Sequence, residues 1–259
     1  MTKEINTDTQ HPVKMHNNLL KSKSTLSLNE TKLLRIIIMQ ILSSDTDLYT
    51  YKVSINELAN MLDIPPANIY RDVKDMCKHL LQEIVEIGDG NPKNKWKLFQ
   101  WCSSCKYENG TITIKLHDDL KPYLLQLTAY YKEYILEDVL LLKSVYSIRL
   151  YELIMQEIGY TKQKVYANKE ANVFLDIDTI RKATDTEDKY EKSNHFKEKV
   201  IDNAIEEINE KLGYYITYKP VKESRKFIGF NFNIKSKVYA EMLLQEKQLE
   251  GQMHITDFL

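Results

Sequence analysis

The chain has 259 residues, enough for one large domain or for two of ordinary size. Hydrophobic residues make up 43% of it, which allows real cores, and 36 basic residues are balanced by 37 acidic ones. That balance excludes a polycation that adheres to nucleic acid over its whole surface, although local basic patches remain possible. Only seven glycines are present, which argues against glycine-rich phosphate-binding loops.

Three cysteines are too few and too oddly numbered for a disulfide framework. No apolar run reaches the length that a membrane span needs, and the polar N-terminus does not have the pattern of a signal peptide. We therefore expect a cytoplasmic protein without a membrane partner.

The first 25 residues are polar and predict a flexible N-terminal arm. A capping box, Ser27 with Glu30, then predicts the start of a helix with an apolar stripe. A second capping box, Ser54 with Glu57, predicts a short helix, which the prolines Pro65 and Pro66 end.

A third helix is expected from about residue 66 to 87, because apolar residues recur there at intervals of four. A turn at 88–92 follows, and strands are predicted at Lys95–Trp101 and Thr111–Leu116, with Asn109-Gly110 as a hairpin turn between them. The order of two helices, a longer helix and a hairpin is that of a winged helix.

The same order recurs later in the chain. Helices are predicted at 144–158, 176–180 and 193–212, followed by strands at 214–219 and 227–234. A further helix is expected at 118–132 between the two units. The sequence thus predicts an α+β fold of tandem winged-helix domains: an arm at 1–25, a first domain at 26–135, a second at 136–236, and a C-terminal helix and tail at 237–259.

The second unit carries the main candidates for DNA contact, because a helix-turn-helix protein reads bases with the N-terminal part of its third helix. A basic connector between the last two strands would lie beside that helix as a wing. A solvated charged face is the alternative. The candidates are Lys192, Ser193, Asn194, Lys197 and Lys199 on the helix, and Lys222, Arg225 and Lys226 on the wing.

The first unit carries a weaker set of candidates. Asn68, Arg71 and Lys74 share the polar side of its long helix, and Lys95 marks the start of the predicted wing. Aspartates dilute this surface, so auxiliary DNA contact and a protein-contact face, such as a dimer interface, are both open.

No pattern for metal, cofactor or catalysis emerges. Cys102 and Cys105 have the spacing of half a zinc knuckle, but no second pair follows. No paired histidines and no phosphate-binding loop motif occur, so we expect no metal, no cofactor and no enzyme activity.

The last eight residues suggest one partner site. Their glutamine, aliphatic and aromatic spacing is similar to peptides that dock into sliding clamps, although it is one residue longer than the usual bacterial form. A frayed tail that packs on its own domain is the alternative. The residues concerned are Gln252, Ile255, Phe258 and Leu259.

Three segments give the chain a family resemblance. Lys143–Leu153 resembles the K-S-x-Y-S-I-R-L-Y-E-L segment of theta-type, iteron-binding plasmid replication initiators. Phe196–Asn209 is similar to their second recognition helix, and Tyr218–Phe232 to their second wing. One departure is Glu198, which lies where relatives often carry a cation.

The resemblance implies a function. In that family, monomers bind directly repeated double-stranded origin sequences (iterons), and the second winged helix supplies most of the base readout. Dimers in equilibrium with the monomers repress the initiator's own promoter. Host replication proteins, among them the host initiator, the helicase and a sliding clamp, are the implied partners.

Two other functions remain open. A winged-helix transcriptional repressor without initiator activity would use a single palindrome. A rolling-circle nicking enzyme would cleave single-stranded origin DNA with a metal.

Overall fold

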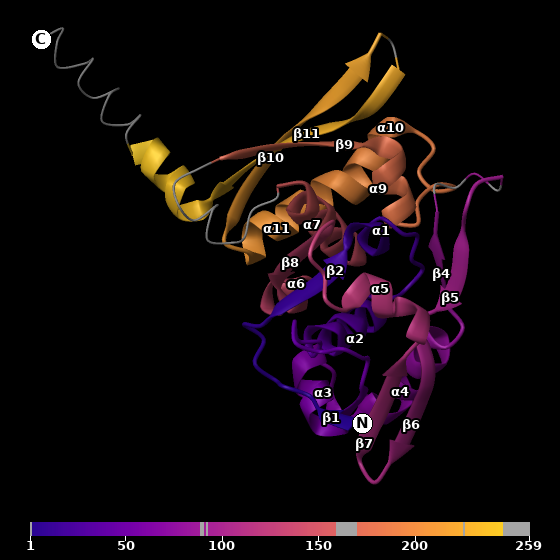
Figure 1. The fold of residues 1–259 in the computed structure, drawn as a ribbon. Coiled ribbons are helices and arrows are strands. Elements are labelled where there is room, and N and C mark those ends of the chain that lie inside the picture. The colour runs from indigo at the N-terminus through magenta and orange to yellow at the C-terminus, as the bar shows by residue number, and fades with distance from the viewer. Residues whose placement is uncertain (1, 89–90, 92, 159–169, 225, 246–259) are drawn as a thin grey trace, which may run out of the picture.

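The structure, a computed structural model, describes residues 2–88, 91, 93–158, 170–224 and 226–245. Figure 1 shows the N-terminal unit below the C-terminal unit, with helices α6 and α7 between them. A hydrophobic core runs through both units. None of the described helices is long and apolar enough to cross a membrane.

The first unit contains the predicted winged helix. Helix α2 (Leu28–Met39) and helix α3 (Ile55–Leu62) each begin at a capping box with both bonds present, as predicted. Helix α4 (Pro66–Leu80) follows. A sheet of order β1-β3-β7-β6 completes the unit, and its main strands are β3 (Thr50–Ser54), β6 (Cys102–Glu108) and β7 (Thr111–Leu116).

The hairpin turn was predicted correctly, but one of its strands was not. Asn109 and Gly110 both have positive φ, at 47° and 75°, and they join β6 to β7 rather than the strand beginning at Lys95 to β7. The wing of this sheet is therefore β6–β7. The mixed polar sequence of β6, whose side chains are mostly exposed, concealed it.

The prediction that the third helix continues to residue 87 is wrong. Helix α4 ends at Leu80, and Ile84–Ile87 forms strand β4, which pairs with β5 (Lys97–Gln100) in a separate hairpin. Isoleucine and valine favour a strand here, because Val85 can bury against Phe99 across the ladder while its neighbours stay more exposed. Apolar residues at intervals of four could not distinguish a strand at Ile84–Ile87 from one more turn of the helix.

The flexible arm predicted for residues 1–25 is also wrong. Strand β1 (Thr2–Glu4) pairs with β3, strand β2 (Pro12–His16) pairs with β8 (Tyr131–Ile135), and helix α1 spans Asn17–Leu20. Val13, Met15 and Leu20 are fully buried. Few apolar residues lie in this segment, but Val13 and Met15 alternate on β2 and Leu19 and Leu20 lie on α1, so that all four are buried.

That pairing also corrects the helix predicted at 118–132. The segment forms a short 3₁₀ turn, η1 (Asp118–Leu120), and one helical turn, α5 (Lys121–Leu124), before the chain enters β8. The strand exists because β2, more than a hundred residues earlier, supplies its hydrogen bonds. Local sequence carries no sign of so distant a partner.

The second unit repeats the arrangement. It comprises α7 (Val145–Ile158), β9 (Ala171–Asp176), α9 (Ile177–Ala183), and a continuous helix made of α10 (Ser193–Phe196), η2 (Lys197–Asp202) and α11 (Asn203–Lys211). The predicted long helix is thus confirmed. Strands β10 (Tyr214–Glu223) and β11 (Lys226–Ser236) form a sheet of order β10-β11-β9.

Two elements lie at the edges of the predicted domains. Helix α6 (Leu136–Leu141) follows β8, and α7 packs against β8 of the first unit and against β9 and α11 of the second. The boundary predicted at residue 135 stays a prediction, because the core is continuous there. A helix at 237–245 follows β11, as expected for the C-terminal segment.

Candidate nucleic-acid interface

The N-terminal end of the long helix in the second unit is open to solvent. Lys192 occupies its N-cap position without a side-chain capping bond, and Ser193, Asn194 and Lys199 are exposed. The ammonium of Lys199 is paired with the carboxylate of its neighbour Glu198 at 2.8 Å. Phe196 is fully buried and fixes the helix to the core on the opposite side. The helix thus has one side packed on the core and another side open to solvent, as a recognition helix requires.

Lys197 is also paired with a carboxylate. Its ammonium contacts both carboxylate oxygens of Asp202, at 3.1 and 2.9 Å, and lies 5.4 Å from the centre of the Tyr218 ring. The hydroxyl of Tyr218 donates a hydrogen bond to the same carboxylate. Asp202 and Tyr218 raise the pKa of Lys197 above its usual value. This cation joins the recognition helix to the first strand of the wing.

The local helix geometry accounts for that contact. Residues 197–202 form a π-helical turn, which is wider than an α-helical turn. Positions five apart, which diverge on an α-helix, are brought onto one side, so Lys197 meets Asp202. Phe196, Val200 and Ala204, spaced by four, are all buried on the core side.

The tip of the β10–β11 hairpin supplies a second group of cations. Lys222 and Lys226 are exposed near the tip, where the register shifts between Val221 and Lys222. Among the described residues, no carboxylate lies within 4 Å of the ammonium groups of these lysines or of Lys192. Arg225, predicted as part of this wing, lies outside the described residues. Figure 1 shows the hairpin projecting past α10.

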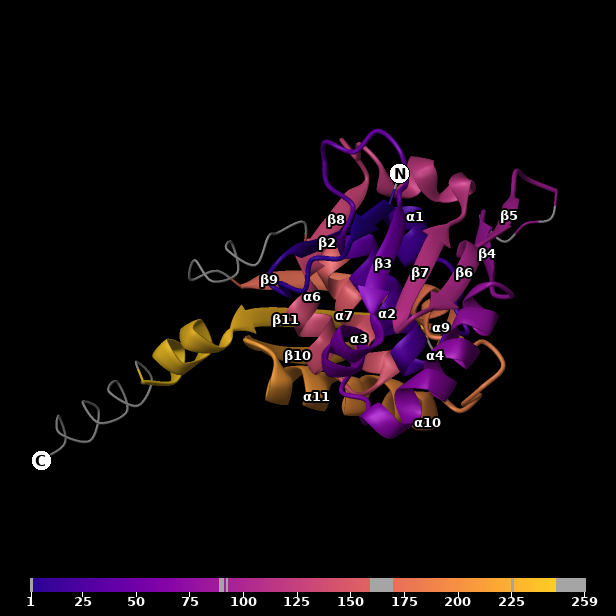
Figure 2. The ribbon, with the colours of Figure 1, turned by 90° about the horizontal axis from the view of Figure 1, so that it is seen from below.

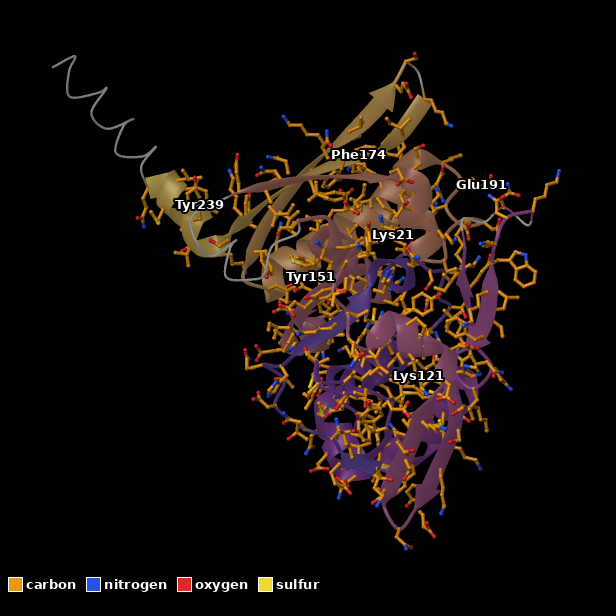
Figure 3. The ribbon with its side chains drawn as sticks, in the orientation of Figure 1. Lys21, Lys121, Tyr151, Phe174, Glu191 and Tyr239 are labelled. Carbon is orange, nitrogen blue, oxygen red and sulfur yellow. The ribbon has the colours of Figure 1, made fainter. Side chains whose placement is uncertain are left out.

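Arg181 was missed by sequence reasoning, yet it organises the turn before the recognition helix. Its guanidinium donates to the carbonyls of Thr186, Lys189 and Tyr190 at 2.6, 2.7 and 2.9 Å. It also lies 4.2 Å from the centre of the Phe196 ring. One side chain therefore holds the turn against the first residues of the helix. Glu191, labelled in Figure 3, lies in this connection. No short motif marks an arginine with three backbone acceptors.

In the first unit the predicted residues are only partly brought together. Asn68, Arg71 and Lys74 are exposed on α4, and Arg71 is paired with Asp72 at 2.9 Å. Lys95 is not beside them. It precedes β5 and lines a cleft of about 1150 Å³ with residues of α1 and α9. The prediction that Lys95 begins the wing is wrong, because the wing is β6–β7.

The two long helices lie on one side of the molecule. Figure 2 shows α4 and the helix α10–α11 along the same edge, with the N-terminus and strand β2 toward the other. One DNA duplex on that side could meet the N-terminal part of both helices. The four tail residues predicted as a clamp-binding site lie outside the described residues.

The two units, each with a three-helix core and a hairpin wing, define the chain as a tandem winged-helix protein. The comparisons with known proteins then identify its family. Residues 12–155 match the family model described as "Initiator Replication protein, WH1", and residues 176–234 match "Initiator Rep protein, WH2". The chain belongs to the family of initiator replication proteins.

A curated relative and a solved structure agree with this. A replication initiation protein of Escherichia coli is 27% identical over 199 residues, covering 74% of this chain and 60% of the relative. The chain thus spans about three fifths of that relative. The crystal structure of the Pi initiator protein in complex with iteron DNA has a TM-score of 0.72 at 22% identity, covering 89% of this chain and 99% of the other. At that identity the likeness shows the fold.

Proposed function

We propose that this protein initiates replication by binding repeated origin sequences in double-stranded DNA. The observation that carries the proposal is the combination, in one unit, of an open recognition-helix end with a wing whose described lysines have no described carboxylate within 4 Å of their ammonium groups. Unpaired cations on a helix end and a neighbouring ribbon can contact the phosphates on both sides of a major groove. The family membership and the solved complex of the Pi initiator with iteron DNA support the same conclusion.

Roles within the interface follow from position. Ser193 and Asn194 lie at the helix end and are assigned to base edges, because short polar side chains there can reach them. Lys192, Lys199, Lys222, Arg225 and Lys226 are assigned to phosphates. In the first unit, Asn68, Arg71 and Lys74 are assigned to auxiliary contacts. Lys95 is left out, because β4 and β5 form a sheet of their own, apart from the β6–β7 wing.

The finer biology rests on the family resemblance. Repression of the protein's own promoter by dimers, and recruitment of the host initiator, the helicase and a sliding clamp, are proposed on that ground alone. The absence of an enzymatic step is part of the same proposal. A transcriptional repressor without initiator activity is the second candidate.

Footprinting the purified chain on the DNA that flanks its gene tests the proposal. Protection of tandem direct repeats, and failure of a plasmid that lacks the gene to replicate, are the expected results. A single protected palindrome with unimpaired replication would favour the repressor. Metal-dependent cleavage of single-stranded origin DNA would overturn both.

A further inference from the structure

Arg149 of α7 joins the two winged helices through a buried side chain. Its Nη2 donates to the carbonyls of Leu20 and Ser22, at 2.6 and 2.9 Å, in the N-terminal part of the first unit. Its Nε donates at 3.0 Å to the carbonyl of Ala183, the last residue of α9 in the second unit. The residue is 3% exposed. One guanidinium thus holds backbone from both units.

The charge of Arg149 is met by a carboxylate that itself binds the first unit. Glu152 accepts from Arg149 Nη1 at 2.8 Å and from Arg35 of α2 at 2.6 and 3.1 Å. Tyr134 of β8 also donates to it. Burial would raise the pKa of Glu152, but the two guanidinium groups hold it below its usual value. The three charged groups are nearly or fully buried. Tyr151, the neighbour of Glu152 on α7, is labelled in Figure 3 and shows where this group of charges lies.

A second link runs directly between the DNA-reading parts of the two units. Lys143, just before α7, forms an ion pair at 2.7 Å with Asp63, which lies in the turn between α3 and α4. The backbone N–H of the same residue donates to Glu207 on α11. The turn that leads into one recognition helix is therefore tied to the other recognition helix.

These contacts oppose movement of one winged-helix unit against the other. Moving one unit against the other would strip buried charges of their partners, which is strongly unfavourable. Each base pair inserted between two binding blocks moves them apart by about 3.4 Å and turns them by about 34°. A rigid pair of reading helices cannot follow that displacement, whereas a loosely tethered pair can.

We propose that Arg149 is a positioning residue that fixes the separation of α4 and α10–α11, so that the protein measures the distance between two blocks of its DNA site. This inference rests on the proposed function. It assigns specificity to a residue that does not touch DNA. It also gives a role to the Lys143–Leu153 segment, for which the sequence showed only a family resemblance.

Selection of bound duplexes from a randomised DNA pool tests the proposal with the full chain. For the wild-type protein we expect two enriched blocks at one fixed spacing. Inserting or deleting one base pair between them should weaken binding at least about tenfold, because one unit then loses its contacts. Two blocks at freely varying spacing, or a wild-type protein that tolerates the insertion, would overturn the inference. If no sequence is enriched, the proposed function itself fails.

Variants at the junction complete the test. In Arg149→Met and Glu152→Gln the blocks should stay the same while the selected spacing spreads, and the insertion should weaken binding less than about threefold. Arg149→Lys should be intermediate. Ile114→Ala, a buried change on β7 outside both links, is the control for loss of core packing and should keep the fixed spacing. An unchanged spacing in folded Arg149→Met contradicts the proposal. Should that variant not fold, the wild-type insertion result decides.

Discussion

The two winged-helix units have similar architecture but differ in where they carry cations without a neighbouring carboxylate. On α4, Arg71 is paired with Asp72 and Lys78 with Asp75, both at 2.9 Å. In the second unit, Lys197 and Lys199 on the helix are likewise paired, with Asp202 and Glu198. The lysines at the helix start and on the wing, Lys192, Lys222 and Lys226, have no carboxylate within 4 Å among the described residues. A cation that already has a neighbouring carboxylate gains less from a phosphate. The availability of the charges, more than their number, therefore ranks the second unit as the main DNA-binding surface.

Removing the three lysines that have no described carboxylate within 4 Å is the most direct test of this difference between the units. Changing Lys192, Lys222 and Lys226 to alanine together should reduce affinity for the origin DNA on the order of a hundredfold or more at low salt. The slope of log affinity against log salt should fall by about 3, since each phosphate contact contributes about 1. Fluorescence anisotropy over a salt series measures both quantities.

The matched control is a lysine away from the interface. Lys121, labelled in Figure 3, lies on α5 and is paired with Asp47 and Asp118. Lys121→Ala should leave the salt slope unchanged. An equal fall in slope for both variants would mean that general charge, and not this surface, attracts the DNA.

The turn before the second recognition helix allows a prediction with no counterpart in the first unit. Arg181→Ala removes the donor to three carbonyls and the contact with Phe196. We expect a loss of about 2 kcal/mol in the free energy of unfolding, together with about tenfold weaker specific binding. Urea denaturation and anisotropy measure the two effects.

Arg181→Lys separates charge from shape. A lysine keeps the positive charge but cannot span three acceptors with a planar group. It should therefore behave like the alanine variant. Full rescue by lysine would show that the cation acts on DNA directly rather than through the turn.

The sequence predicted the elements whose signals are local. Both capping boxes, the Asn109-Gly110 turn and the helix anchored by Phe196 lie where they were expected. Two of the failures share one cause, which is a partner distant in sequence. Strand β8 depends on β2, and β1 on β3, so these residues looked helical or disordered when considered alone. Strand β4 was missed for another reason: its partner β5 is close in sequence, but its apolar residues continue the spacing of the preceding helix.

The candidate site was also predicted only in part. The exposure of Ser193, Asn194 and Lys222 follows from amphipathic spacing, and the structure agrees with it. The pairing of Lys197 with Asp202 could not be predicted, because it depends on a π-helical turn. Arg181 was missed because its acceptors are backbone carbonyls, which carry no residue signature.

The structure changes what is expected of Lys197. Because its ammonium already contacts Asp202, Lys197→Ala should weaken binding of origin DNA by only about threefold. Asn194→Ala should cost more, roughly tenfold, and should relax the preferred base at one position. A larger and base-specific loss for Lys197→Ala would mean that the ion pair opens when DNA binds.

The smallest effect is expected in the first unit, from the α4 cation that no ion pair engages among the described residues. Lys74→Ala should lower the salt slope by at most about 1 and affinity by a few fold, equally for repeat and random DNA. Equal loss follows because a phosphate contact carries no sequence information. If Lys74→Ala instead alters self-association measured by analytical ultracentrifugation while DNA affinity is unchanged, this face of α4 contacts protein. The two recognition helices would then have different partners.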